Sequence, residues 1–230
     1  MTETANIPRS IGMILDGNRR YAREKGLPSL EGHRLGYEKL KEVARWCKEK
    51  GVEYLIVYAF STENWNRAPE EVGYLTELIK TILTEGTREL QKEHMRVRFI
   101  GQLERFGKEI AESARKTETE TKDNDELTVV IALSYGGRAE ILKAAQELLK
   151  NPPEGELTEE VFEKHLWTAG IPDPDIILRT GGEQRLSGFL SWQGVYSELF
   201  FVPTYWPAFS KEEFEQILEE YGKRQRRHGK

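Results

Sequence analysis

The chain of 230 residues has a single cysteine and no long apolar segment. Cys47 cannot form an internal disulfide, and without cysteine pairs a structural zinc site built on thiolates is not expected. The longest apolar run covers residues 54–60, far short of the roughly 20 residues that cross a bilayer. Residues 1–9 contain no apolar core of a signal peptide. These absences predict a cytoplasmic protein.

Two further absences restrict the ligands. The chain contains no G-x-x-x-x-G-K-[ST] phosphate loop and no G-x-G-x-x-G fingerprint after a predicted strand, so a nucleotide is not the first choice. Asp and Glu outnumber Lys and Arg by 39 to 34, and this net charge of −5 argues against a nucleic acid as partner. With 38% hydrophobic residues over this length, the chain can bury the core of one α/β domain.

The remaining pattern alternates short apolar runs with longer segments of helical periodicity. It predicts an α/β fold: a single domain over 1–230 with a central, mostly parallel six-stranded sheet flanked by helices. Residues 1–9 and 223–230 are expected as flexible tails, and the charged stretch 112–125 as a solvated face. The predicted strands cover 11–15, 54–60, 97–100, 127–133, 175–178 and 199–202. The predicted helices cover 32–50, 69–94, 103–122 and 158–169, with one between Arg138 and Lys150 and a last one after Ser210.

The ends of the predicted strands carry the candidate site. Ligands of parallel α/β sheets bind outside the carboxyl ends of the strands, and four strand ends here are rich in Gly, Arg, Ser, Asn or acidic residues. Guanidinium groups match phosphate oxygens, and Gly17, Gly181 and Gly182 would let backbone N–H groups approach an anion. The candidate anion binders are Arg19, Arg20, Arg67, Arg138, Arg179 and Arg185. One site built from several loops is therefore predicted.

Several of these residues also have a plainer interpretation, which the sequence leaves open. Asp16 and Glu198 could hold Mg²⁺ together with phosphate oxygens, but Asp16 also fits a turn and Glu198 a paired surface charge. His33 is either a helix-start residue bonded to backbone or a phosphate donor or general acid–base. The apolar stripe of the predicted helix 69–94 either lines a tunnel or belongs to the core. Its members are Val72, Leu75, Ile79, Ile82 and Leu83.

Five motifs occur in order over nearly the whole chain. They are D-G-N-R-R-Y-A at 16–22, G-H-R-L-G at 32–36, Y-A-F-S-T-E-N-W-N-R at 58–67, Y-G-G-R at 135–138, and R-T-G-G-E-Q-R-L-S at 179–187 followed by Y-S-E-L-F-F at 196–201. Together, with this spacing, they resemble the cis-prenyltransferase family, whose bacterial members are undecaprenyl diphosphate synthases. The D-D-x-x-D motif of the trans-prenyltransferases is absent.

The resemblance implies an isoprenyl transferase that condenses isopentenyl diphosphate with an allylic diphosphate, typically farnesyl diphosphate, in successive cis additions. The expected product is a long-chain polyprenyl diphosphate such as undecaprenyl diphosphate, a lipid carrier for cell-wall glycan. By residue-wise match, Asp16 would be catalytic and hold Mg²⁺, Asn64 would help to remove the proton, and Glu198 would complete the metal site. The substrate-binding residues would be Gly17, Asn18, Arg19, Arg20, Tyr21, His33, Ser61, Thr62, Glu63, Trp65, Arg67, Arg179, Arg185, Leu186 and Ser187.

The resemblance also implies a homodimer, a hydrophobic tunnel for the growing chain, and peripheral membrane contact when the product is released. The segment Arg227-His228-Gly229 resembles the family's C-terminal R-x-G element, which can reach the partner's site. Three positions depart from the usual bacterial pattern: Ser29 stands for Arg, Leu15 for Met and Arg19 for Gly. The primer preference is therefore left open.

Two other functions would require different sequence features. Some family members are non-catalytic accessory subunits, which tend to lose the aspartate of D-G-N and to acquire a membrane segment, whereas this sequence keeps Asp16 and shows no such segment. A generic Mg²⁺-dependent phosphohydrolase would need a second carboxylate close to Asp16 in sequence to hold a water nucleophile, and none is present.

Overall fold

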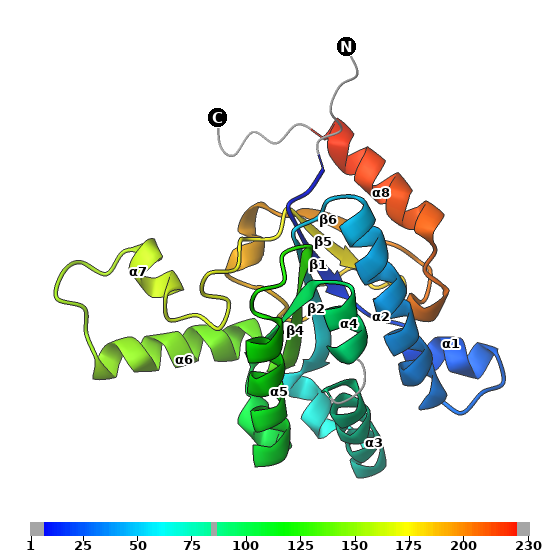
Figure 1. The fold of residues 1–230 in the computed structure, drawn as a ribbon, viewed down its shortest axis with the longest axis horizontal. Coiled ribbons are helices and arrows are strands. Elements are labelled where there is room, and N and C mark those ends of the chain that lie inside the picture. The colour runs from blue at the N-terminus through cyan, green and yellow to red at the C-terminus, as the bar shows by residue number, and fades with distance from the viewer. Residues whose placement is uncertain (1–6, 84–86, 225–230) are drawn as a thin grey trace.

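The computed structural model describes residues 7–83 and 87–224. Its six strands form one sheet in the order β3-β4-β2-β1-β5-β6, and every neighbouring pair is parallel (Figure 1). The strands are β1 Ser10–Ile14, β2 Tyr54–Ser61, β3 Met95–Gly101, β4 Leu127–Tyr135, β5 Ile176–Arg179 and β6 Glu198–Phe201. The predicted single α/β domain with a parallel six-stranded sheet is thus confirmed.

Both faces of the sheet are buried, which explains why the strands read as nearly continuous apolar runs. In β2, Leu55 and Val57 belong to one core cluster, while Ile56 and Tyr58 belong to a second cluster on the opposite face. Helices α2 Glu31–Glu49, α3 Pro69–Thr81, α5 Lys108–Thr121 and α8 Lys211–Lys223 contribute to the first cluster. On the other side lie α6 Gly137–Lys150 and α7 Glu159–Glu163 (Figure 1).

Two predicted helices are shorter in the structure, and a third is described in two parts. The range 69–94 is described as α3 and as α4 Thr87–Lys92, and residues 84–86 between them lie outside the described part. The range 103–122 is divided by Gly107, whose φ of 95° ends a short 3₁₀ helix, η3 Leu103–Phe106, before α5 begins. The range 158–169 is helical only to Glu163, because a series of i−3 turns follows. Across Gly107 the helical spacing of buried residues continues through Phe106, Ile110 and Ala114, although the helix is interrupted there.

The stretch 112–125 has the predicted solvated face, on which Glu112, Lys116 and Glu120 are exposed, but a second face of it is buried. Ala114, Thr117 and Thr121 on α5 are buried. The Thr121 hydroxyl accepts a hydrogen bond from the Val97 N–H at 3.0 Å and donates one to the Thr117 carbonyl at 2.9 Å. A buried threonine can satisfy its hydroxyl through local backbone groups, so this face of α5 packs against β3 despite its polar sequence.

The chain ends are described only in part. The Arg9 N–H donates to Asp175 Oδ2 at 2.7 Å, just before β5. Lys223 is the last residue of α8, so these parts of the predicted tails belong to the folded domain. Residues 1–6 and 225–230, including the R-H-G segment at 227–229, lie outside the described residues. A search of the described helices finds none with the length and apolar character needed to cross a membrane.

Candidate active site

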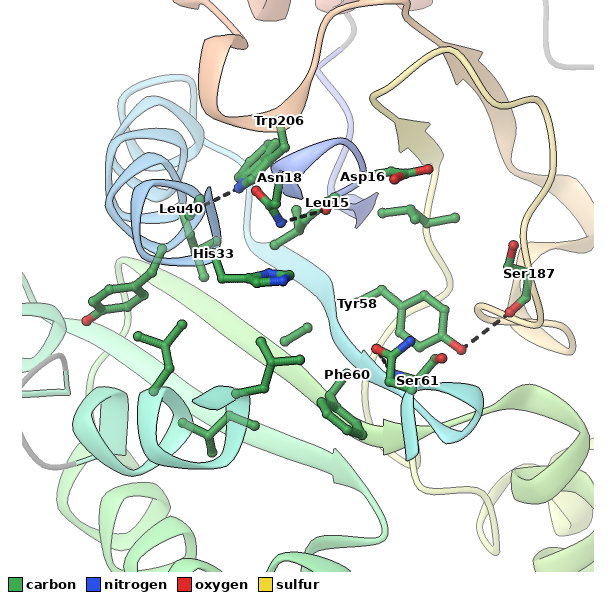
Figure 2. A pocket seen from close by; sticks show the side chains of 18 of the residues that line it. Leu15, Asp16, Asn18, His33, Leu40, Tyr58, Phe60, Ser61, Ser187 and Trp206 are labelled. Atoms are coloured by element: carbon green, nitrogen blue, oxygen red, sulfur yellow. Dashed lines mark hydrogen bonds between the residues drawn. The ribbon is translucent and has the colours of Figure 1, made fainter. Parts of the chain in front are cut away.

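A pocket of about 470 Å³ opens at the carboxyl edge of the sheet, beside the ends of β1, β2 and β5 (Figure 2). One part of its wall is polar and is formed at the strand ends. The opposite part is apolar and includes Leu75, Leu78, Ile79 and Ile82, which lie on one face of α3 and at its end. His33 reaches into the pocket from α2, opposite Tyr58 and Ser187 (Figure 2). The site therefore combines an apolar wall with a charged edge.

The motif G-H-R-L-G lies in α2 and allows another helix to pack very closely against α2 beside the charged edge of the pocket. Helix α1 Asn18–Glu24 packs against α2 at Gly32 and Gly36, which lie one helical turn apart. A Cβ at Gly32 would lie 2.1 Å from the Asn18 carbonyl oxygen, and a Cβ at Gly36 would lie 2.3 Å from Asn18 Oδ1. The two glycines therefore fix where α1 begins and where its arginines lie.

Asp16 follows β1 and is held between two guanidinium groups. Its Oδ2 accepts a hydrogen bond from Arg179 Nη2 at 2.8 Å, and its Oδ1 lies 3.1 Å from Arg20 Nη2. Burial alone would raise the pKa of Asp16, but the hydrogen bonds and positive charges of Arg179 and Arg20 outweigh it and lower the pKa. Asp16 is therefore ionised at neutral pH.

Arg179 also organises the loop that follows β5. Its side chain is only 7% exposed, and its Nη1 donates to Ser187 Oγ at 2.9 Å and to the Arg185 carbonyl oxygen. This single guanidinium therefore joins the end of β5, the loop 185–187 and Asp16. The sequence places Asp16 and Ser187 far apart, and the parallel pairing of β1 with β5 brings them together.

Nine of the residues predicted from the resemblance line this pocket. They are Asp16, Asn18, His33, Ser61, Glu63, Asn64, Arg67, Arg179 and Ser187. Gly17, Arg19 and Arg20 line an adjoining hollow of about 250 Å³, which also contains Arg23 and Arg67. This adjoining hollow has the charge expected of an anion site, because four guanidinium groups surround it.

Asn64 lies in the short 3₁₀ helix η1 Thr62–Asn66, directly after β2. Its amide oxygen accepts the Ser61 N–H at 3.1 Å. The amide nitrogen, for which the described residues provide no hydrogen-bond partner, is a donor that a ligand could accept from. The geometry favours an orienting role for this residue over the role of a base.

Other predicted residues lie elsewhere. Trp65 packs against Phe60 and Phe106, with ring centroids 5.0 and 4.8 Å apart, and its Nε1 donates to Ser134 Oγ at 2.9 Å. It therefore anchors η1 to the core and does not line the pocket. The ring of Tyr21 lies 5.8 Å from Lys25 Nζ, and Thr62 lies next to Gly136. Arg138 is exposed in the first turn of α6, and Arg185 is 60% exposed and paired with Glu183. Leu186 packs against the second core cluster.

The two glycines of the R-T-G-G segment do not offer their backbone N–H groups to an anion. The Gly181 N–H donates to the Thr204 carbonyl at 2.8 Å, and the Gly182 N–H donates to the Val202 carbonyl at 2.9 Å. This expectation was wrong, because both donors are already used in folding. Gly181 serves instead as a point of close approach, since a Cβ there would lie 2.7 Å from Arg20 Nη2.

Glu198 lies on the wrong edge of the sheet to share an ion with Asp16 within one chain. It is the first residue of β6 and pairs in register with Ile176, the first residue of β5, whereas Asp16 lies beyond the last residue of β1. Its Oε2 accepts a hydrogen bond from Arg224 Nη1 at 2.8 Å. In the described ranges, 7–83 and 87–224, no group of three His, Cys, Asp or Glu side chains is arranged to hold a metal ion.

A residue that the sequence did not single out lies beside the charged part of the pocket. Glu71 on α3 is buried, with Arg19 Nη1 at 2.9 Å from its Oε2 and Arg67 Nη1 at 2.8 Å from its Oε1. His33 Nε2 lies 3.5 Å from Oε1. Acidic residues are common in a first helical turn after a proline, so the sequence around Pro69 gave no reason to single this one out. The i,i+4 spacing of Arg67 and Glu71 was the available signal.

Comparison with known proteins finds similar sequences that cover nearly the whole chain. The family described as "Putative undecaprenyl diphosphate synthase" matches residues 14–229. The isoprenyl transferase of Thermotoga maritima is 43% identical over 226 residues, which cover 97% of each chain. The isoprenyl transferase of Agrobacterium fabrum is 42% identical over 233 residues, covering 99% of this chain and 94% of the relative.

Solved structures show the same arrangement of the backbone. Lavandulyl diphosphate synthase from Lavandula x intermedia, in complex with dimethylallyl diphosphate, matches with a TM-score of 0.92 and 29% identity, over 97% of this chain and 99% of that one. A probable undecaprenyl diphosphate synthase from Campylobacter jejuni matches with a TM-score of 0.83 and 34% identity, over 98% of this chain and all of that one.

Proposed function

Because this chain belongs to the undecaprenyl diphosphate synthase family of isoprenyl transferases, we propose that it condenses isopentenyl diphosphate with an allylic diphosphate. The primer we propose is farnesyl diphosphate. Successive cis additions extend it to a long-chain polyprenyl diphosphate such as undecaprenyl diphosphate, for use as a carrier lipid in cell-wall synthesis.

The observation that carries this proposal is the two-part wall of the main pocket. Asp16, Arg179 and Arg67 lie at one part of it, and the apolar side chains of α3 form another. A prenyl diphosphate has the same division, with an anionic head and an apolar chain. At about 470 Å³ the pocket has the size of ordinary small-molecule sites, and a longer product would extend it into the proposed tunnel.

Two cation clusters provide for two anionic substrates. The adjoining hollow with Gly17, Arg19 and Arg20 suits the diphosphate of the allylic primer, together with His33. Arg179, Arg185 and Ser187 would bind the diphosphate of isopentenyl diphosphate. Since the substrates repel each other, holding them in separate clusters brings their reacting carbons together at low entropic cost.

The residues around the reacting atoms have distinct tasks. The arginines stabilise the negative charge that develops as the allylic diphosphate departs. Asn64 orients isopentenyl diphosphate through its amide nitrogen, and the substrate's own diphosphate accepts the proton. The remaining motif residues order the chain near the substrates: Asn18, Tyr21, Ser61, Thr62, Glu63, Trp65 and Leu186.

Asp16 is the residue that would hold Mg²⁺. A protein site for this ion commonly supplies one or two carboxylates and leaves other positions to water and substrate phosphates. Both oxygens of Asp16 contact arginines, so this carboxylate does not hold the ion by itself. The donor set fits Mg²⁺ only when a bound diphosphate supplies further oxygens. When bound, Mg²⁺ neutralises charge on the departing diphosphate.

The position of Glu198 supports a homodimer. A carboxylate at the amino edge of the sheet can join an ion near Asp16 only if it comes from a second chain. Val195 and Leu199, close to Glu198 in sequence, are 72% and 40% exposed, which suits a face that a second copy covers. Release of an apolar product would further bring the enzyme into contact with a membrane surface.

Incorporation of labelled isopentenyl diphosphate tests the proposal. The purified protein is given C10, C15 and C20 allylic diphosphates in parallel, with and without Mg²⁺, and the products are separated by chain length. Mg²⁺-dependent long-chain product from the C15 primer is expected. No incorporation with any primer, from protein shown to be folded, would contradict the proposed activity.

A further inference from the structure

The carboxylate of Glu71 lies where three parts of the chain meet. It contacts Arg19 from α1, Arg67 from the segment between η1 and α3, and His33 from α2. Each of its oxygens accepts a hydrogen bond from one guanidinium, at 2.9 Å for Arg19 and 2.8 Å for Arg67. The proposed function gives Arg19 and His33 a role at the diphosphate of the primer, and Arg67 lines the same hollow.

The charges of this cluster favour a carboxylate between the two arginines. Two guanidinium groups that approach one anion repel each other, and a carboxylate between them offsets that repulsion. Burial lowers the pKa of His33, and Arg67 and Arg19 lower it further, so His33 is neutral at pH 7 although Glu71 acts in the opposite direction. The cluster therefore carries a net charge of +1 from two guanidinium groups and one carboxylate.

The hydrogen bonds leave most of each guanidinium available. A guanidinium has five N–H donors, and the bonds to Glu71 come from Nη1 of each arginine. Arg19 and Arg67 both line the hollow that contains Arg20 and Gly17. Held at one nitrogen by Glu71, each arginine can present its other donors to an anion in that hollow.

We propose that Glu71 is a positioning residue, which holds Arg19 and Arg67 together so that they bind the diphosphate of the allylic primer. The inference rests on the proposed function. Because Glu71 lies on the same helix as Leu75 and Ile79, it also ties the diphosphate site to the apolar wall of the pocket. An anion bound by the two arginines is thereby linked to the placement of α3.

A purely structural role makes a different prediction. An acidic residue in a first turn stabilises its helix through the helix dipole, and a partly buried ion pair can hold α3 in place. Under that interpretation, loss of the Glu71 charge lowers the melting temperature and leaves the affinity for anions unchanged. Under the proposal, it weakens binding of the primer specifically.

The test compares Glu71→Gln with Glu70→Gln, which removes the same charge from an exposed neighbour in the same helical turn. Titration with inorganic pyrophosphate should show binding at least about tenfold weaker for Glu71→Gln and within about twofold of wild type for Glu70→Gln. In turnover, Glu71→Gln should raise KM for the allylic diphosphate about tenfold or more and change KM for isopentenyl diphosphate by less than about twofold.

A second variant covers the case in which Glu71→Gln does not fold. Glu71→Asp keeps the charge but shortens the side chain, and its pyrophosphate affinity should lie between those of wild type and Glu71→Gln. Wild-type affinity in a Glu71 variant that is folded but less stable would overturn the proposal. Because pyrophosphate binding needs no turnover, this result can be separated from a failure of the proposed prenyl transfer.

Discussion

Replacement of Arg179 by methionine should separate its structural role from its binding role. Methionine keeps the length of the apolar stem but removes the guanidinium, which donates to Asp16, to Ser187 and to the Arg185 carbonyl. A hydrogen bond to a charged group contributes about 1.5–3 kcal/mol, and each bond to a neutral acceptor about 1 kcal/mol. Since Asp16 keeps Arg20 and some exposure to water, the expected loss of stability is about 3 kcal/mol.

Arg185→Met provides the matched control. The Arg185 side chain is 60% exposed and pairs with Glu183, so its loss should cost less than about 1 kcal/mol. In a chain of this size each kcal/mol shifts the melting temperature by about 2–4 °C. Arg179→Met should therefore melt roughly 6–12 °C below wild type. The melting temperature of Arg185→Met should fall by no more than about 4 °C.

Steady-state kinetics then compare the two substrates. Both substitutions should raise KM for isopentenyl diphosphate more than KM for the allylic primer, because both arginines belong to the same proposed anion site. Removal of Arg179 also removes the main cause of the low pKa of Asp16, so that pKa should rise in Arg179→Met. Equal loss of stability in the two variants, or equal effects on both KM values, would refute this reasoning.

Two more predictions concern packing and pH. Gly36→Ala should destabilise the protein by about 1–3 kcal/mol in chemical unfolding, because its Cβ would lie 2.3 Å from Asn18 Oδ1. Gly73→Ala is the control: no atom lies within 4 Å of its Cβ, so this substitution should be neutral or stabilising. The pKa of His33 is lowered by burial, so the unfolded chain binds the proton more readily, and stability falls as pH drops below about 6.5. Between pH 7 and pH 5 wild type should therefore lose more stability than His33→Gln; equal losses would contradict a buried neutral imidazole.

The sheet could be predicted from the sequence because parallel strands buried on both faces leave a simple pattern. Apolar runs such as 54–60 occur at each strand and end in polar loops. Interruptions within helices were harder to predict, because the helical spacing of buried residues continues across Gly107, where the helix is interrupted. Backbone geometry at such points depends on how the flanking segments pack, which one sequence does not show.

The sequence predicted the place of those site residues that follow directly from their position at the end of a strand. Asp16, Ser61 and Arg179 each lie at or just beyond a carboxyl end, so they meet at one edge. Glu198 comes just before the predicted strand 199–202, which in a parallel sheet is the opposite edge, so its expected place beside Asp16 rested on the resemblance alone. For Glu71 the sequence offered only the i,i+4 spacing with Arg67, because only the folded chain brings Arg19 to the same carboxylate.

Turnover by Asp16→Asn is the most direct test of the central claim, that Asp16 is the carboxylate around which prenyl transfer is organised. The variant should still unfold cooperatively, because Asp16 lies at the pocket and is not part of the apolar core. Its incorporation of labelled isopentenyl diphosphate at saturating Mg²⁺ should fall at least about 100-fold. A folded variant that keeps more than half of the wild-type rate would contradict the account.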